Sequence, residues 1–114
     1  MDIGTREKNQ YHIIDVVGKV DRLKDSIVLK SCFNTLLEKG VSRVAMNLAG
    51  ITYLDSGALN VLIYCNNTLR KKGGELVLIE PNEYVRDVLE VVGLHKLVKI
   101  FAREEEFNNE TNVA

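Results

Sequence analysis

Three helical segments, each ended by a glycine, alternate with short β-branched runs, and this order restricts the fold more than any other feature. From 25 to 39, apolar residues recur every three or four positions, and Gly40 follows as a helix stop. Similar patterns cover 57–72, ended by Gly73, and a third segment ended by Gly93. Strands that alternate with helices of this length form right-handed β–α–β units, so the sequence predicts a mostly parallel sheet.

The predicted strands are rich in Val, Ile and Leu. They fall at 2–8, 11–20, 43–48, 75–80 and 98–101. The first has the weakest pattern and is expected at an edge of the sheet. The predicted fold is therefore a single α/β domain with a mostly parallel, four- to five-stranded sheet, three main helices and a short carboxyl-terminal helical turn. We place this domain at 1–108 of the 114 residues, followed by a flexible tail at 109–114.

The charge balance argues against several classes of function. Fifteen Lys and Arg residues against 16 Asp and Glu give a formal net charge of −1, which provides no basic surface for nucleic acid. No apolar run approaches the ~20 residues that cross a bilayer. The start of the chain also lacks the apolar core of a signal peptide. We therefore expect a cytoplasmic protein that contacts neither nucleic acid nor a membrane.

The cysteines and histidines indicate no metal or redox site. Cys32 and Cys65 fall in two different predicted helices and form no CxxC pair. His12 and His95 are isolated, without a second ligand at metal-binding spacing. We predict core positions for the cysteines, structural or surface positions for the histidines, and no metal or other cofactor.

The remaining chemistry lies in the segment Tyr53-Leu54-Asp55-Ser56-Gly57, between a predicted strand and a predicted helix. As a helix N-cap, Asp55 or Ser56 would accept hydrogen bonds from amides of the first turn. As a nucleophile, Ser56 would need a base and an oxyanion hole, and the segment lacks the G-x-S-x-G pattern of hydrolases. As a phosphate acceptor, Ser56 would place the phosphoryl group at the positive end of the helix dipole.

The predicted helix at 57–72 carries a second candidate surface. At 100° per residue, its outer face opposite the apolar arc contains Asn60, Val61, Tyr64, Asn67 and Thr68. An exposed valine and tyrosine beside a phosphate acceptor would suit a partner, since tyrosine is enriched in interfaces. Isolated exposed apolar residues are also common on protein surfaces, which is the alternative interpretation. Asn66 falls inside the apolar arc, and nothing in the pattern explains it.

Across about residues 10–107, the chain resembles STAS domains of the anti-sigma factor antagonist family. The resemblance rests on an ordered set of short motifs at compatible spacings. They are Gly18-Lys19-Val20-Asp21, Val44-Ala45-Met46-Asn47-Leu48, Tyr53-Leu54-Asp55-Ser56, Lys72-Gly73-Gly74-Glu75-Leu76 and Val92-Gly93-Leu94. Each motif alone is weak, whereas the ordered set is fairly specific.

The resemblance implies a STAS-type fold, a site and a partner. Ser56 matches the serine that is phosphorylated by an anti-sigma factor with serine kinase activity, and Asp21 and Asp55 match the acidic residues beside it. The unphosphorylated form would bind the anti-sigma factor and free a sigma factor. Phosphorylation would end this binding and a serine phosphatase would restore it, so the protein is not expected to be an enzyme. The predicted partner-contacting residues are Gly57, Asn60, Val61, Tyr64 and Asn67.

The segment after Ser56 departs from the family pattern. The family usually continues Asp-Ser with Ser or Thr, then Gly, then Leu, whereas here Gly57 and Ala58 precede Leu59. Ala58 would add a methyl group where a kinase approaches the backbone, or Gly57 would loosen the turn around Ser56. An alternative therefore stays open, in which the chain is a STAS adaptor, or a module that senses a small ligand or nucleotide, and Ser56 only caps the helix.

Overall fold

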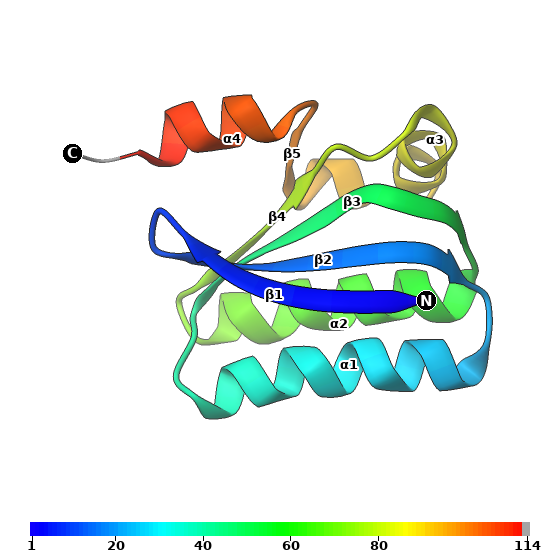
Figure 1. Cartoon of the computed structure of the whole chain (residues 1–114), viewed down its shortest axis with the longest axis horizontal. Helices are drawn as coiled ribbons and strands as arrows, with labels where there is room; N and C mark the ends of the chain where they lie inside the picture. Colours follow the sequence, from blue (N-terminus) through cyan, green and yellow to red (C-terminus); the bar gives the residue numbers. More distant parts are fainter. Residues whose placement is uncertain (113–114) are drawn as a thin grey trace.

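In the computed structural model, which describes residues 1–112, a five-stranded sheet lies between two layers of helices (Figure 1). The strands are β1 (Asp2–Lys8), β2 (Tyr11–Val20), β3 (Arg43–Leu54), β4 (Glu75–Ile79) and β5 (Lys99–Phe101). The helices are α1 (Leu23–Glu38), α2 (Ser56–Lys71), α3 (Glu83–Val91) and α4 (Glu104–Thr111), with a short 3-10 turn, η1 (Leu94–Lys96).

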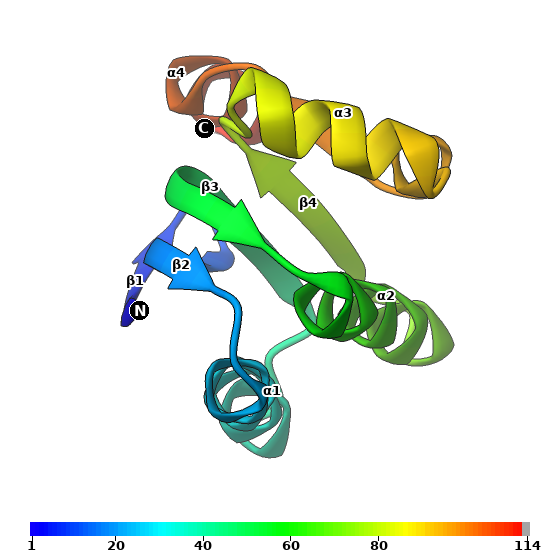
Figure 2. The same ribbon diagram turned by 90° about the vertical axis from the view of Figure 1, so that its right-hand side faces the viewer.

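The strands are ordered in space as they are in the sequence, β1-β2-β3-β4-β5. β1 pairs with β2 antiparallel, and the three other pairings are parallel. Figure 2 shows α1 and α2 on one face of the sheet and α3 and α4 on the other. The predicted α/β class, the mostly parallel sheet and the edge strand at 2–8 are confirmed.

The face of the sheet under α1 and α2 carries the larger core. Its buried members include Leu29, Phe33, Met46, Leu48, Leu62 and Leu69. Along β3, Val44 and Met46 belong to this core, while Ala45 belongs to a smaller cluster on the other face. This alternation follows from the two-residue period of a strand. The buried face predicted for the first helix is present in α1.

β3 is longer than its sequence pattern predicts. It continues six residues past the predicted end at Leu48, to Leu54, and runs beside the second half of β2. The β2–β3 register shifts between Asp15 and Val17, which is a β-bulge or similar irregularity. Gly50 permits the close approach there, because a Cβ atom at this position would lie 2.8 Å from Cγ2 of Val17. The longer β3 places the Asp-Ser segment at the very end of a strand.

The opposite face of the sheet combines a smaller apolar cluster with an ionic one. α4 buries Phe107 against Tyr11 and Phe101, at ring-centroid distances of 5.2 and 5.5 Å. α4 is therefore a packed helix of eight residues, longer than the single turn predicted. The predicted tail at 109–114 begins inside α4, and its last two residues lie outside the described part of the chain.

Arg6 of β1 links the sheet to α4, because its guanidinium group pairs with Asp15 of β2 and with Glu104 of α4. Its Nε lies 2.8 Å from Oδ2 of Asp15, and its Nη2 lies 2.5 Å from Oε1 of Glu104. Hydrogen bonds from Arg6 lower the pKa of both Asp15 and Glu104 below the usual range of carboxyl groups. All three side chains are only partly buried, so this cluster adds orientation more than stability.

Candidate functional site

The Asp-Ser segment lies at the edge of the sheet where β2 and β3 both end. The backbone N–H of Asp55 donates to the carbonyl oxygen of Val20 at 3.0 Å, and Val20 pairs with Leu54 in the parallel register. Asp21 follows Val20 directly, so the two predicted acidic residues stand at the ends of neighbouring strands. Loops at the carboxyl ends of parallel strands are a common place for functional residues in α/β folds.

Asp55 is the N-cap of α2, and Ser56 is the first helical residue. Oδ1 of Asp55 accepts a hydrogen bond from the backbone N–H of Ala58 at 2.9 Å. The sequence predicted either Asp55 or Ser56 as the N-cap residue of this helix, and the structure shows that it is Asp55. Ser56 is exposed, and within the described chain no hydrogen bond engages its hydroxyl. The serine is therefore available to another molecule.

Gly57 allows the start of α2 to lie close to α1. A Cβ atom at Gly57 would lie 2.9 Å from Oγ of Ser26 and 3.2 Å from Oδ1 of Asp55. Ser26 is buried, and its hydroxyl has no hydrogen-bond partner among the residues that the structure describes. Glycine at this position is therefore explained by the limited space between α1 and the start of α2.

The prediction of an exposed Val61 is wrong. Val61 is only 5% exposed and belongs to the core under α1 and α2. The sequence pattern assumed that α2 buries one narrow arc, whereas α2 packs against both the sheet and α1. A helix with two packing surfaces buries a wider arc, and that arc includes Val61. Asn60 and Asn67 are exposed, as predicted.

Tyr64 is half-buried between α1 and α2. Its ring meets Phe33 edge-on at a centroid distance of 5.9 Å, and Nζ of Lys30 lies 4.3 Å from the ring centroid. Its hydroxyl donates to Oδ1 of Asn34 at 2.7 Å. These contacts join the two helices, which gives Tyr64 a structural role that the predicted partner-contacting role did not include.

An aromatic pair near Ser56 was not found by sequence reasoning. Tyr84 follows the apolar spacing of α3, which predicts burial, but it is 42% exposed. Its ring stacks on Tyr53, which is 44% exposed, at a centroid distance of 6.0 Å and an interplanar angle of 14°. Tyr53 is the next-to-last residue of β3, the strand that leads to Ser56, while Tyr84 lies 31 positions later, so no local pattern could have paired them.

The start of α1 adds exposed apolar side chains at the same end of the molecule. Leu23 is 78% exposed and Ile27 is 58% exposed. They flank Ser26, whose hydroxyl lies under Gly57. We call the exposed residues Leu23, Ile27, Tyr53, Ser56, Asn60 and Tyr84 the Ser56 surface. Exposed apolar groups gathered around a free hydroxyl are typical of a protein-binding surface.

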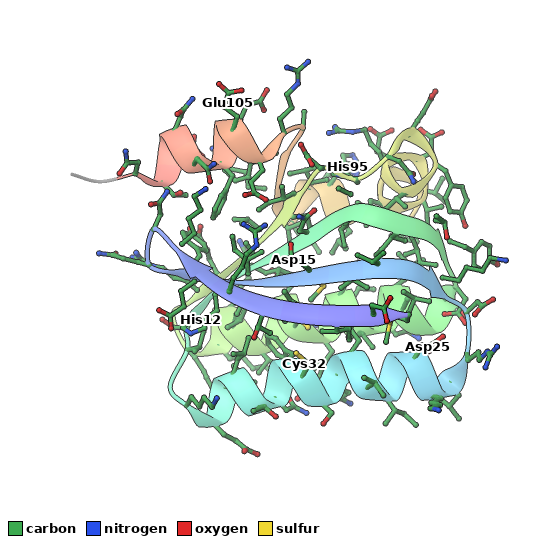
Figure 3. The ribbon with its side chains drawn as sticks, viewed as in Figure 1. His12, Asp15, Asp25, Cys32, His95 and Glu105 are labelled. Atoms are coloured by element: carbon green, nitrogen blue, oxygen red, sulfur yellow. The ribbon has the colours of Figure 1, made fainter. Side chains whose placement is uncertain are left out.

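The structure places no histidine as a base for Ser56. His12 lies near the start of β2, at the end of the sheet away from α2's first turn, and its Nε2 is 2.7 Å from Oε1 of Glu7 (Figure 3). Asp25, in the first turn of α1, lies at the Ser56 end instead. Within residues 1–112, no three His, Cys, Asp or Glu side chains gather as metal ligands. None of the helices in the same residues is long and apolar enough to cross a membrane.

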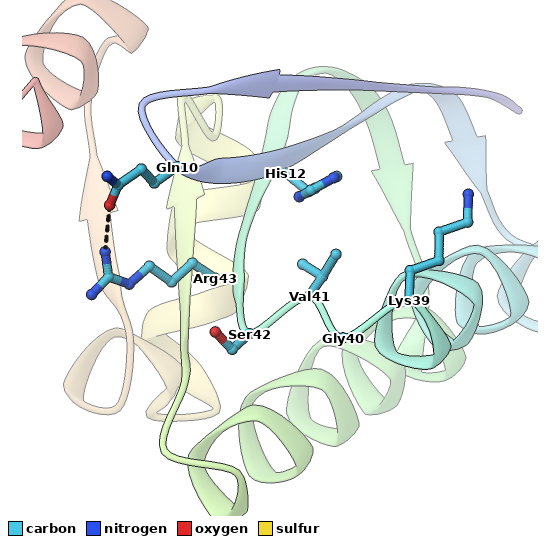
Figure 4. Close-up of a pocket in the computed structure, with 7 residues that line it drawn as sticks. All are labelled: Gln10, His12, Lys39, Gly40, Val41, Ser42 and Arg43. Atoms are coloured by element: carbon cyan, nitrogen blue, oxygen red, sulfur yellow. Dashed lines mark hydrogen bonds between the residues drawn. The ribbon is translucent and has the colours of Figure 1, made fainter.

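A cavity of about 490 Å³ opens at the end of the molecule away from Ser56 (Figure 4). It lies between the β1–β2 turn and the loop after α1, and its lining includes His12, Lys39 and Arg43. Nη1 of Arg43 donates to Oε1 of Gln10 at 3.2 Å across its mouth. The cavity and the Ser56 surface lie at opposite ends of β2. The cavity is therefore not part of that site.

Comparisons with known proteins converge on one family. The STAS domain family model matches residues 3–107. A protein of Thermotoga maritima, provisionally named an anti-sigma factor antagonist, is 32% identical over 72 residues, or 63% of this chain. That match spans 64% of the relative's length. The anti-sigma-B factor antagonist of Listeria monocytogenes is 27% identical over 109 residues, covering 95% of each chain.

Solved structures of low sequence identity show the same fold. The crystal structure of an anti-sigma factor antagonist candidate from Thermotoga maritima has a TM-score of 0.84 at 23% identity, covering 97% of this chain and 95% of the other. The anti-sigma factor antagonist SpoIIAA in its unphosphorylated form has a TM-score of 0.82 at 16% identity, covering 99% of both chains. These likenesses concern the arrangement of the sheet and helices alone.

Proposed function

The chain belongs to the STAS domain family, and from that premise we propose that it acts as an anti-sigma factor antagonist. In this proposal the unphosphorylated protein binds an anti-sigma factor that is also a serine kinase, and so frees a sigma factor. Phosphorylation of Ser56 ends the binding, and a serine phosphatase restores it. The protein is then a ligand and a substrate in the cycle, and it catalyses no step.

The observation that carries the proposal is the exposed Ser56 hydroxyl on the first turn of α2, with Asp55 already serving as the cap. The amides at the start of a helix lack intrahelical partners and favour negative charge. A phosphoryl group adds about −1.5 to −2 charges at neutral pH. The start of α2 would accommodate these charges without unfolding, so their effect would fall on the partner.

Asp21 and Asp55 would strengthen the effect of phosphorylation on partner binding, because they place further negative charge close to Ser56. Both stand where β2 and β3 end, beside Ser56. Phosphorylation therefore raises a negative charge that is already present locally. A partner surface fitted to the neutral hydroxyl would have to desolvate this charge or face it with like charge, and either effect weakens binding.

We place the contact with the anti-sigma factor on the Ser56 surface. Tyr53, Tyr84, Leu23 and Ile27 offer exposed apolar area around the serine. Asn60 lies one turn further along α2 and is also exposed. Val61 is buried and Tyr64 joins α1 to α2, so we do not include these two residues in the direct contact. Gly57 contributes by shaping the first turn of α2.

The first experiment compares wild type, Ser56→Ala and Ser56→Asp as baits in the host's lysate, with circular dichroism to show that all three fold. We expect wild type and Ser56→Ala to capture an ATP-binding, kinase-like protein and Ser56→Asp to lose it. Ser31→Asp is the matched control, because it adds the same charge at an exposed position of α1. The captured partner, purified and given ATP, should add one phosphoryl group at Ser56.

Three results would count against the proposal. Capture of the same proteins by all three baits would make Ser56 irrelevant to binding and the domain an adaptor. Phosphate mapped to Thr52 or Thr68 would keep a switch but move it away from Ser56. Equal loss of the partner in Ser31→Asp would show that added charge anywhere on this side disrupts binding.

A further inference from the structure

Asn66 is a buried amide in the apolar arc of α2, and it lines a cavity of about 190 Å³. The residue is 3% exposed. The cavity lies between α2, the start of β4 and the segment that leads into β5. Pairing of β4 with β5 begins at Val77 and Lys99, and before these residues the two segments diverge. The cavity occupies the space that this divergence leaves.

A buried amide needs hydrogen-bond partners, because an unpaired polar group inside a protein is unfavourable. In the described part of the chain, no protein group forms a hydrogen bond with the Asn66 side chain. The fully occluded side-chain atoms without a partner there are Oγ of Ser26 and Oδ1 of Asn108. The Asn66 amide is not one of these occluded atoms, since it borders the cavity. The group that this amide can bond to is therefore water or a ligand in the cavity.

The other walls indicate what that partner is. Arg70 also lines the cavity and lies one helical turn after Asn66, on the same side of α2. Leu76, Leu97 and Val98 supply apolar walls. Glu75 and Lys99 border the cavity too, but their charged ends are engaged elsewhere. The carboxylate of Glu75 accepts from the hydroxyl of Tyr11, and the ammonium group of Lys99 pairs with Glu110.

We propose that this cavity binds a small aliphatic carboxylate. The guanidinium group of Arg70 presents two parallel N–H donors that match the two oxygens of a carboxylate. The amide nitrogen of Asn66 donates a further hydrogen bond, and the carbon chain lies against Leu76 and Val98. The volume equals roughly six waters at ~30 Å³ each, and it is smaller than pockets for drug-sized ligands. The ligand therefore has only a few carbon atoms.

This site is separate from the Ser56 surface. Asn66 lies ten positions after Ser56 in α2, which is about 15 Å along the helix axis. The proposal therefore stands without the phosphorylation switch. It also accounts for the polar residue that the amphipathic pattern of α2 left unexplained.

NMR titration of the ¹⁵N-labelled protein with sodium butyrate tests the proposal, with 1-butanol as the neutral probe of equal chain length. We expect saturable shifts confined to the Asn66 side-chain amide, Arg70, Leu97 and Val98. Butanol should bind at least about tenfold more weakly, because it lacks the charge that Arg70 pairs with. Shifts that grow linearly with butyrate, or that spread over surface lysines and arginines, would overturn the proposal as adventitious anion binding.

Three variants make the test specific. Asn66→Leu completes the apolar arc with a residue of similar size and should abolish the saturable response. Arg70→Gln, at an exposed position, should weaken butyrate binding about tenfold or more. Lys71→Gln removes the same charge from the next exposed position and should leave the affinity unchanged. An unchanged saturable response in Asn66→Leu, or in Arg70→Gln should Asn66→Leu fail to fold, would contradict the assignment.

Discussion

The helices are held to the sheet by two kinds of contact, because α1, α2 and α3 contribute to one large apolar core whereas α4 does not. Under α1 and α2, a continuous apolar core joins both helices to the strands, with Phe33 fully buried at its centre. On the other face, Phe107 is the buried residue that α4 contributes among those described, and Arg6 and Glu104 supply a partly exposed ion pair. The difference indicates that the first face positions Ser56, while α4 can detach without moving it.

The largest expected effect separates the two faces directly. Phe33→Ala removes a fully buried ring from the core that carries α2, and we expect it to cost about 3–5 kcal/mol of the free energy of unfolding. Phe107→Ala removes a ring that is equally buried, but it lies between α4 and the rim of the sheet. We expect it to release α4 and leave the rest of the domain folded.

Chemical denaturation and hydrogen exchange distinguish these two outcomes. In Phe107→Ala, amide exchange should accelerate in 104–111, while protection in α2 and binding of the anti-sigma factor persist. In Phe33→Ala, protection should fall throughout the domain. If both variants lowered the denaturation midpoint equally and lost protection in α2 together, the two faces would form one cooperative unit and the comparison would fail.

A smaller effect tests how the first face sets the position of Ser56. Gly57→Ala places a methyl carbon 2.9 Å from Oγ of Ser26 and 3.2 Å from Oδ1 of Asp55. We expect a loss of about 1–3 kcal/mol in the free energy of unfolding, because the helices must separate. Ser26→Ala removes the nearer atom and leaves Cβ of residue 26 at 3.8 Å, which is an ordinary contact.

The double variant, Ser26→Ala with Gly57→Ala, should therefore recover most of the lost stability and of the binding to the anti-sigma factor. Ser26→Ala alone should be close to neutral, since it deletes a buried hydroxyl that has no partner among the described residues. Denaturation of the four proteins gives the coupling energy of the pair. Absence of coupling would assign the cost to the contact with Asp55, and so to the helix cap.

Sequence patterns predicted the parts of this molecule that depend on local order. The buried face of α1, the bounds of β2 and the Asp-Ser segment at a strand–helix junction all follow from periodicity and turn residues. The sequence pattern failed where a residue packs against two elements that are distant in the sequence. Val61 is buried because α2 meets both the sheet and α1, and β3 runs past its predicted end beside β2, where Gly50 approaches Val17.

The Ser56 surface shows the same limit of sequence-based prediction, because only part of it could be identified from local patterns. Asp55 and Ser56 were found because they lie between a predicted strand and a predicted helix, and Asp21 was assigned from the resemblance to STAS domains. Tyr84 follows the apolar spacing of α3, and nothing local shows that its ring stacks on Tyr53. Contacts of this kind depend on how α3 lies over the end of β3, where Nδ2 of Asn82 donates a hydrogen bond to the carbonyl oxygen of Ile51 at 2.9 Å.

The smallest expected effect concerns the ion pairs that hold α4. The pKa values of Asp15 and Glu104 are lowered in the folded protein, chiefly by hydrogen bonds from Arg6. Their contribution to stability is therefore complete above the unfolded-state values of about 4, and it is lost as the pH falls through the lower folded values. Protection of amides in α4 should be constant from neutral pH to about pH 5 and should decline below about pH 4.

Glu104→Gln removes one carboxylate of this cluster and should cost at most about 1 kcal/mol, because the pair is partly exposed and screened by salt. The acid-induced loss of α4 protection should shrink in this variant. Glu105→Gln is the matched control, since Glu105 is exposed and points away from the sheet (Figure 3). An equal change in Glu105→Gln would mean that α4 responds to the charge of its first turn in general. In that case the pairing of Arg6 with Glu104 would not be what holds α4 to the sheet, and Phe107 would carry more of the attachment.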